Sequence, residues 1–349
     1  METNRKILRF NRKPPTLVDD SIEGDFARFL GAEIPTPEIV SYQGVRVTGM
    51  GLLVDNGRIL PESFPDHLEG KGWKLQYDEY HQPIRWIKSV AGAYLKPTEH
   101  VAEPALWVTD TWADSFFFWL TEVLPRLVFA RSQLGPEVPL YFPGAMYSIP
   151  FIKESLDILG ERPKLIPPGE VRKFADLHIP LRMAAIHDMN PLWVNETGKR
   201  LREHLKVDRV PGRRVNISRR QARKRKLENQ DAVEAILEKH GFENVVMESL
   251  SMTEQLKLMA ETSVLCALHG AGLSHMLAMP PGGTVIEIQP RGGINSSFFN
   301  LADACGHRYI FVQSEVRSES DKSIHADSWL EPDVLEQALS LAGVGKSSS

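Results

Sequence analysis

The sequence predicts an α/β protein of two domains, the second of them a doubly wound parallel sheet. The chain has 349 residues, which at roughly 150 residues per domain corresponds to about two domains. Hydrophobic residues make up 42% and charged residues 25% of the sequence, as in an ordinary globular protein. Beyond residue 105, strand-like apolar runs alternate with segments of helical length, the pattern that parallel sheets require.

The first half of the chain predicts irregular elements followed by a long helix. Residues 45–48 alternate apolar and polar side chains, and residues 55–57 have the composition of a turn. An apolar run at 105–108 predicts a buried strand, and residues 114–133 predict a helix. Pro125 lies inside this helix, which should kink there because proline has no amide proton for the helical ladder.

Strand-like and helix-like segments alternate along the rest of the chain. We expect strands at 138–142, 164–166, 177–180, 214–218, 245–247, 263–268, 284–288 and 309–312. We expect helices at 149–160, 191–205, 229–240, 251–260, 295–305 and 331–341. The break at 207–212 contains Pro211-Gly212 and predicts a linker. The expected organisation is therefore a domain at 1–206 with an irregular, β-rich start, a second domain at 207–330, and a terminal helix with a frayed tail at 331–349.

Charge and cysteine content exclude several classes of protein. The formal net charge of −4 gives no overall attraction to nucleic acid or to an anionic membrane. Two cysteines, Cys266 and Cys305, are too few for a disulfide framework or a cysteine zinc site. No signal peptide follows Met1, and no apolar stretch approaches the roughly 20 residues of a membrane span. We therefore expect a soluble, cytoplasmic protein.

The most specific local motif is His269-Gly270-Ala271-Gly272, between an expected strand and a short helix. Glycines at such a turn let the backbone approach a ligand, and the free amides of the helix start favour phosphate. A tight turn that needs glycine explains the pattern equally well, and a lone histidine is more often structural than catalytic. A helix end contributes only about 0.3–2 kcal/mol to anion binding. A diphosphate site therefore also needs side-chain cations.

Cations are concentrated in residues 212–226, which contain eight basic residues and no acid. These residues are Arg213, Arg214, Arg219, Arg220, Arg223, Lys224, Arg225 and Lys226. Arg219 and Arg220 follow the first strand of the second domain, where a doubly wound fold binds its ligand, and arginine suits phosphate oxygens. The alternative is a solvated basic loop, which residues 224–226 favour more than Arg219 does.

Glu287 interrupts an apolar strand. A buried carboxylate is costly unless it has a partner. Glu287 therefore either binds a hydroxyl of a ligand or pairs with an arginine or a backbone amide of the protein.

Taken in order, the motifs of the chain resemble glycosyltransferase family 61. The resemblance covers roughly residues 107–313, is densest after residue 213, and does not include the first hundred residues. The segments that carry it are 214–220, 225–229, Gly241-Phe242, Glu248, Glu254-Gln255, 269–273 and 285–287.

The resemblance implies a GT-B arrangement, in which two Rossmann-like, doubly wound domains face each other across a cleft. It implies inverting, metal-independent transfer of a sugar from a nucleotide sugar, expected to be UDP-linked, to a glycan or lipid-linked glycan in capsular or other cell-surface polysaccharide synthesis. Neither a cofactor nor a metal is expected, and the sequence contains no Asp-x-Asp motif. The nucleotide contacts would be Arg219, Arg220, Gly270, Ala271, Gly272, Leu273 and Glu287, and the catalytic residues Glu122 and His269.

One motif departs from the family pattern. Bacterial relatives typically read His-Trp-x-x-Glu-x-Leu-Pro-Arg-Leu, and this chain has Phe118 in place of the histidine while keeping Glu122. Glu122 is then the expected general base. Asp114 is a second candidate for the base, with helix capping as its alternative role. Phe118 implies an accessory role for the histidine, a changed acceptor, or reduced activity.

Three other functions were weighed against sugar transfer. A catalytically inactive, nucleotide-binding GT-B scaffold is the main alternative, and Phe118 favours it. Nucleic-acid binding through residues 212–226 is disfavoured, because the segment lacks interleaved aromatic residues and the rest of the chain is acidic. A serine hydrolase is excluded because no Gly-x-Ser-x-Gly motif occurs. Peripheral association with the inner face of the cell membrane, through a lipid-linked acceptor, is left open.

Overall fold

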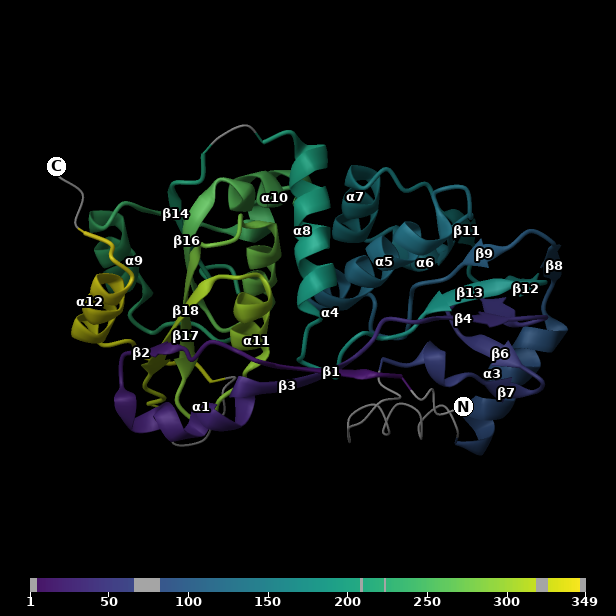
Figure 1. Cartoon of the computed structure of the whole chain (residues 1–349), viewed down its shortest axis with the longest axis horizontal. Coiled ribbons are helices and arrows are strands. Elements are labelled where there is room, and N and C mark those ends of the chain that lie inside the picture. The colour runs from purple at the N-terminus through teal and green to yellow at the C-terminus, as the bar shows by residue number, and fades with distance from the viewer. Residues whose placement is uncertain (1–4, 66–81, 208–209, 223, 318–325, 346–349) are drawn as a thin grey trace. The chain divides into compact units, whose positions relative to one another are not determined.

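The computed structural model divides the chain into two compact units. It describes residues 5–65, 82–207, 210–222, 224–317 and 326–345. Unit 1 comprises Met1–Leu8 and Glu33–Thr197, and unit 2 comprises Arg9–Ala32 and Gly198–Ser349 (Figure 1). Helix α8 (Pro191–Leu205) contains the boundary near residue 198.

Unit 2 is built around a six-stranded parallel sheet. The strand order is β15-β14-β16-β17-β18-β2. The strands are β2 (Thr16–Leu17), β14 (Arg213–Ile217), β15 (Phe242–Val245), β16 (Thr262–Leu268), β17 (Thr284–Pro290) and β18 (Arg308–Ser314). When the strands from β15 to β18 in this order are numbered by their position along the chain, they read 2-1-3-4-5. This is the strand order of a doubly wound sheet, and its switch point lies between β14 and β16. The predicted α/β class with parallel sheets is confirmed.

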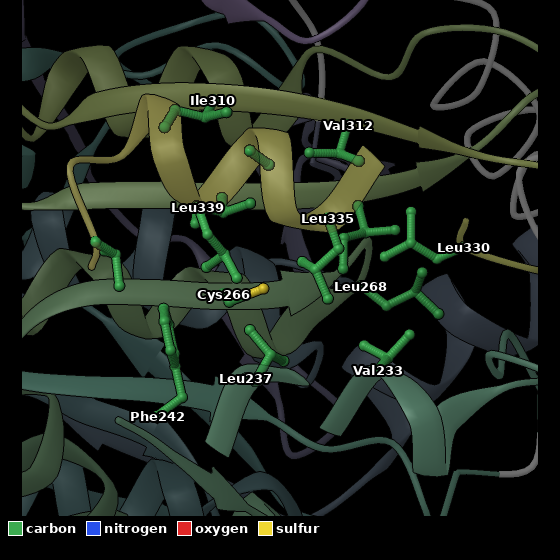
Figure 2. Packing of buried hydrophobic residues seen from close by; sticks show 14 residues of the cluster. Val233, Leu237, Phe242, Cys266, Leu268, Ile310, Val312, Leu330, Leu335 and Leu339 are labelled. Carbon is green, nitrogen blue, oxygen red and sulfur yellow. The ribbon is translucent and has the colours of Figure 1, made fainter. Parts of the chain in front are cut away.

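Helices cover both faces of this sheet. Helices α9 and α12 lie on one face, and α10 and α11 on the other (Figure 1). The helical elements of unit 2 are η1 (Asp20–Ile22), α1 (Glu23–Leu30), α9 (Gln230–Lys239), η4 (Met247–Ser249), α10 (Met252–Ala260), η5 (Ala271–Ala278), α11 (Ser297–Ala304) and α12 (Pro332–Leu341). Figure 2 shows α9 and α12 packing apolar side chains such as Leu237 and Leu339 against Cys266 and Ile310 of the strands.

Alternation along the central strands decides which side chains face α11. Ile286 and Ile288 belong to the core that α9 and α12 cover. Successive side chains of a strand point to opposite faces. Glu287 therefore points to the other face, where α11 packs on β18.

Unit 1 has mixed sheets. Their strand orders are β7-β6-β5-β12-β8, β4-β13-β9 and β10-β11. The strands of these sheets are β4 (Ile39–Tyr42), β5 (Arg46–Thr48), β6 (Leu53–Asp55), β7 (Arg58–Ile59), β8 (Thr98–Val101), β9 (Ala105–Leu106), β10 (Tyr141–Pro143), β11 (Lys164–Ile166), β12 (Val171–Phe174) and β13 (Leu177–Pro180). Strands β1 (Ile7–Asn11) and β3 (Gly31–Pro35) pair with each other, and each contains a boundary between the two units. β12 pairs antiparallel with β5 and parallel with β8. In the other sheets β9 pairs parallel with β13 and β10 pairs parallel with β11, and an isolated parallel bridge joins Leu106 to Leu140. Unit 1 therefore also contains parallel strands, and the Rossmann-like, doubly wound arrangement expected for the first domain stays a prediction.

The long helix expected at 114–133 is divided into three helical pieces. The helical elements of unit 1 are η2 (Pro61–Ser63), α3 (Pro83–Leu95), α4 (Phe116–Phe118), η3 (Trp119–Val123), α5 (Leu124–Leu134), α6 (Gly144–Tyr147) and α7 (Pro150–Ile158). Element η3 is a π-helical turn, and Pro125 stands at the start of α5 directly after it. The wider turn accommodates the missing amide proton without ending the helix.

The expected domain boundaries need three corrections. Residues 9–32, expected in the first domain, belong to unit 2, because β2 adds a sixth strand next to β18 and Phe26 packs at ring-centroid distances of 5.5 Å from Phe299 and 5.0 Å from Phe311. Residues 198–206 also belong to unit 2. The terminal helix, expected as a separate piece, is α12, which is part of the unit 2 core.

The substitution Phe26→Ala tests the first correction. It should lower the free energy of unfolding of unit 2 by about 3–5 kcal/mol, because it empties a buried aromatic site. Urea denaturation read through hydrogen exchange of β17 and β18 peptides measures this unit. The control Leu8→Ala, at a side chain that is 43% exposed, should change it by no more than about 0.5 kcal/mol. Equal effects of the two substitutions would contradict the assignment.

Candidate functional site

The switch point of the unit 2 sheet brings Arg219 and Gly270 together. Each residue lies two positions beyond the end of its strand, β14 or β16, and Ile217, the last residue of β14, pairs with Ala267, the residue before the last of β16. A Cβ atom on Gly270 would lie 2.8 Å from Nη1 of Arg219. Gly270 has an extended backbone, with φ at 166°, so any side chain there would push the Arg219 guanidinium away from the turn. The guanidinium of Arg219 thus lies against the turn.

Arg225 places a second guanidinium at the same turn. Its Nη1 donates to the carbonyl oxygen of His269 at 3.4 Å, and its own carbonyl accepts from Nε of Arg219 at 2.8 Å. Its φ of 58° is left-handed, which is uncommon for a residue other than glycine. The sequence had favoured a solvated loop at 224–226, and nothing local distinguishes Arg225 from its basic neighbours.

The environment of these two guanidinium groups is electrostatically unfavourable. Burial lowers the pKa of Arg225, and burial together with the nearby charge of Arg225 lowers the pKa of Arg219. Glu248 and Asp327 oppose the shift of Arg219. Within the described parts of the chain, neither guanidinium forms a recorded ion pair with a carboxylate. Two half-buried cations at one turn form a site suited to an anion.

Arg220 does not share this environment. Its Nη2 lies 2.6 Å from Oδ1 of Asp231 and 2.6 Å from Oε2 of Glu234, both on α9. The hydrogen bond with Glu234 is the largest cause of the raised pKa of Arg220. The expectation that Arg220 binds the nucleotide is therefore corrected, because its charge is already paired with two carboxylates.

The start of η5 completes the turn with backbone groups. Ala271 and Gly272 are the first two residues of η5, so their amides have no acceptor within the helix. The amide of Leu273 donates to the carbonyl of Gly270 at 2.9 Å, and the Leu273 side chain is fully buried. Leu273 therefore packs in the core, contrary to the expected nucleotide contact. His275, whose pKa burial lowers to about 4, holds the Gly272 carbonyl at 2.7 Å through Nδ1.

His269 and Glu287 form a buried pair. Nδ1 of His269 donates to Oε1 of Glu287, which also accepts from Nε2 of Gln289 at 3.2 Å. The other oxygen of Glu287 accepts from the hydroxyl of Tyr309 at 2.5 Å. Burial and the charge of Glu287 raise the pKa of Tyr309, so its hydroxyl keeps its proton.

Glu287 is enclosed by the protein and supports His269. Its exposure is 0%, so the predicted direct nucleotide contact is replaced by the pairing alternative, with histidine and tyrosine as partners instead of arginine or an amide. The hydrogen bond to Glu287 occupies Nδ1 of His269. For the other ring nitrogen, Nε2, the described residues show no hydrogen-bond partner. Phe298 lies edge-on to the ring at 5.2 Å. A carboxylate and an aromatic residue therefore fix the orientation of a histidine next to the Arg219 and Arg225 site.

Glu122 belongs to unit 1, where it is part of a buried group of charges. It lies in η3, is 5% exposed, and has its Oε2 atom 3.4 Å from Nη2 of Arg182. Nearby, Arg126 pairs with Asp110 at 2.8 Å, and burial lowers the pKa of Arg126. The guanidinium of Arg182 also lies 5.6 Å from the centre of the Phe118 ring.

Phe118 thus occupies the family's histidine position by packing on the arginine that pairs with Glu122. Trp112 packs on the ring of Phe118, with ring centroids 4.9 Å apart. Asp114, the second candidate for the base, is exposed in the turn before α4. Sequence reasoning missed Arg182, which lies 60 positions beyond Glu122 in a segment without a motif. Among the described residues, no three His, Cys, Asp or Glu side chains are grouped so that they could hold a metal ion.

Comparison with known proteins gives one family and several relatives. Residues 116–286 match the model of the family described as Glycosyltransferase 61. The EGF domain-specific O-linked N-acetylglucosamine transferase of Drosophila melanogaster is 33% identical over 118 residues, which are 33% of this chain and 22% of that protein. Alpha-1,3-arabinosyltransferase XAT3 of Oryza sativa subsp. japonica is 33% identical over 88 residues, 23% of this chain and 15% of that protein.

A second rice protein, alpha-1,3-arabinosyltransferase XAT2, is 32% identical over 111 residues, 30% of this chain and 18% of that protein. The chain therefore spans less than a quarter of the length of each of these three relatives.

The substitution Tyr309→Phe tests the buried network. It removes one hydrogen bond to a buried carboxylate, and should lower the free energy of unfolding of unit 2 by about 1.5–3 kcal/mol. Urea denaturation with hydrogen exchange provides the measurement. The control is Tyr141→Phe. The hydroxyl of Tyr141 donates to the half-exposed Glu103 at 3.4 Å, so its loss should change the free energy of unfolding little. A Tyr309→Phe protein as stable as the wild type would show that Glu287 does not depend on Tyr309.

Proposed function

We propose that this protein transfers a sugar from a nucleotide sugar to a hydroxyl group of a glycan, a function supported by the match of residues 116–286 to the model of glycosyltransferase family 61. The observation that carries the proposal is the pair of guanidinium groups, Arg219 and Arg225, beside Gly270. Both are half-buried, and neither has a recorded carboxylate partner in the described chain. A diphosphate supplies the negative charge that this turn lacks.

The two arginines supply most of the affinity in this proposal. A hydrogen bond to a charged group contributes about 1.5–3 kcal/mol. The start of η5, with the amides of Ala271 and Gly272, adds about 0.3–2 kcal/mol. The arginines also supply the positive charge that a divalent cation would bring to a diphosphate, which supports transfer without a metal.

His269 is placed to assist the leaving group. In a single displacement with inversion, the acceptor oxygen bonds to the anomeric carbon as the bond from that carbon to the diphosphate oxygen breaks. The diphosphate leaves with the electron pair of that bond. In this proposal Nδ1 of His269 donates to Glu287, which fixes the ring, and Nε2 donates a hydrogen bond to the departing diphosphate oxygen. This role requires a proton on both ring nitrogens.

The base that takes the acceptor proton must lie opposite the leaving group. The family resemblance assigns this role to Glu122, a residue of unit 1, and we retain that assignment as part of the proposal. Its ion pair with Arg182 holds the carboxylate in one place. Asp114 remains the second candidate for the base.

The substrates are proposed at the level of chemical class. The curated relatives are named for N-acetylglucosamine and for arabinose, so the family accommodates different sugars. We propose a UDP-linked sugar as donor and a glycan or lipid-linked glycan as acceptor, in the synthesis of capsular or other cell-surface polysaccharide. A cytoplasmic location, or one at the inner face of the membrane, is supported by the two free, buried cysteines.

A second candidate function is a nucleotide-binding scaffold without catalysis. The observation that favours it is the environment of Glu122, which is enclosed and paired with Arg182, while Phe118 replaces a histidine that could share a proton. This alternative shares the diphosphate site and differs only in turnover.

The nucleotide site is tested by alanine substitutions at Arg219 and Arg225. Each should weaken the affinity for UDP about tenfold or more, because each removes a charged hydrogen bond. Isothermal titration calorimetry gives the dissociation constants. The neighbouring Arg220→Ala is the control and should leave the UDP affinity within about twofold, since α9 carboxylates already hold that side chain. Equal losses in all three proteins would argue for a diffuse charge effect.

Catalysis is tested by Glu122→Gln, with Asp114→Asn alongside it. Release of UDP from a panel of UDP-sugars, with and without glycan acceptors, measures turnover. Glu122→Gln should lower the rate at least about 100-fold with UDP affinity nearly unchanged, and Asp114→Asn should have little effect. Full turnover by Glu122→Gln would remove Glu122 from the mechanism. Wild-type protein that binds UDP but turns over no sugar would establish the scaffold function.

A further inference from the structure

Helix α3 of unit 1 has apolar side chains on two faces. One face packs on the protein: Val90 and Ala93 are buried, and Trp86 is half-buried against the same core as Leu52 and Phe64. The spacing of Trp86, Val90 and Ala93 matches one side of a helix. This face accounts for the attachment of α3 to unit 1.

The other face of α3 exposes large aliphatic side chains. Ile84 is 70% exposed, Ile87 is 55% exposed and Leu95 is 84% exposed. At about 100° per residue these three lie within an arc of roughly 80° on the helix. Of the ten large hydrophobic side chains exposed in the described chain, four are on α3. The fourth, Tyr94, has protein partners, because its hydroxyl accepts from the Gly57 amide and Arg46 stacks on its ring.

The charges of α3 have one sign. Lys88 lies on the helix next to the arc of Ile84, and Lys96 follows its last turn; both are exposed. The helix contains one further basic residue, Arg85, and no acid. Long lysine side chains can extend along an apolar surface and keep the ammonium group at its edge. An aliphatic strip with lysines beside it fits a surface that is apolar beneath an anionic layer.

We propose that Ile84, Ile87, Leu95, Lys88 and Lys96 form a face that docks the protein on an anionic lipid surface. Apolar side chains enter the interface between headgroups and acyl chains, while basic residues bind anionic headgroups. A second copy of the chain fits this face poorly, because two such faces would bring lysines of the same charge together. The helix lies on the membrane and does not cross it: its 13 residues span about 20 Å. No helix in the described chain has the length and apolar character of a membrane span.

Vesicle sedimentation with the full chain tests the proposal. The protein should sediment with phosphatidylcholine vesicles that contain phosphatidylglycerol, and much less with phosphatidylcholine alone. High salt should release part of the bound protein, because it screens the lysines. Absence of binding to the anionic vesicles would overturn the proposal. A dimer in sedimentation velocity that dissociates with Ile87→Glu would overturn it as well.

Substitutions locate the binding on α3. Ile87→Glu combined with Leu95→Glu should lower the fraction bound to anionic vesicles about tenfold, and Lys88→Glu should lower it while weakening its response to salt. The control is Leu192→Glu, at a leucine that is 67% exposed on α8. Circular dichroism and UDP binding should be unchanged in all of these proteins. Vesicle binding that survives the α3 substitutions, or falls equally with Leu192→Glu, would show that this face is not the docking surface.

Discussion

The candidate site depends on two guanidinium groups being held close together without a carboxylate between them. Burial lowers the pKa of both guanidinium groups, and repulsion from Arg225 adds to the shift of Arg219. The fold keeps them there with backbone carbonyls, which accept from Arg219 at 2.8 and 2.9 Å. The carboxylates of α9 are occupied by Arg220. The positive charge is therefore left for a ligand, which is the physical basis of the proposed diphosphate site.

The parallel sheet determines which groups surround that charge. Strands β14 and β16 end at the same edge, so residues some 50 positions apart in sequence meet at the switch point. Alternation along β17 turns Glu287 toward α11, where His269, Gln289 and Tyr309 hydrogen-bond to it. A buried carboxylate that would be costly alone is thereby satisfied, and it orients His269.

Sequence patterns predicted the parts of the fold that have regular periodicity. Most strands and helices of unit 2 were predicted, and so was the neighbourhood of Arg219 and Gly270, because both follow strands of one sheet. The strand expected at 245–247 was misplaced, because β15 is Phe242–Val245 and η4 begins at Met247. Strand β2 was missed since two residues carry no alternating pattern, and with it the membership of residues 9–32 in unit 2. The environments of Arg220 and Arg225 were predicted wrongly, because arginines of one basic segment cannot be told apart by sequence pattern. Tertiary contacts pair Arg220 with two carboxylates and half-bury Arg225. The ion pair of Arg182 with Glu122 was not predicted, because the two residues lie far apart in the sequence.

The most direct measurement is an NMR titration of the isotope-labelled protein with UDP, observing backbone amides and arginine side chains. The account predicts saturable shifts at the amides of Ala271 and Gly272 and at the Nε–H groups of Arg219 and Arg225, with the Nε–H of Arg220 unaffected. Saturable binding whose shifts lie elsewhere, with these groups unchanged, would contradict it.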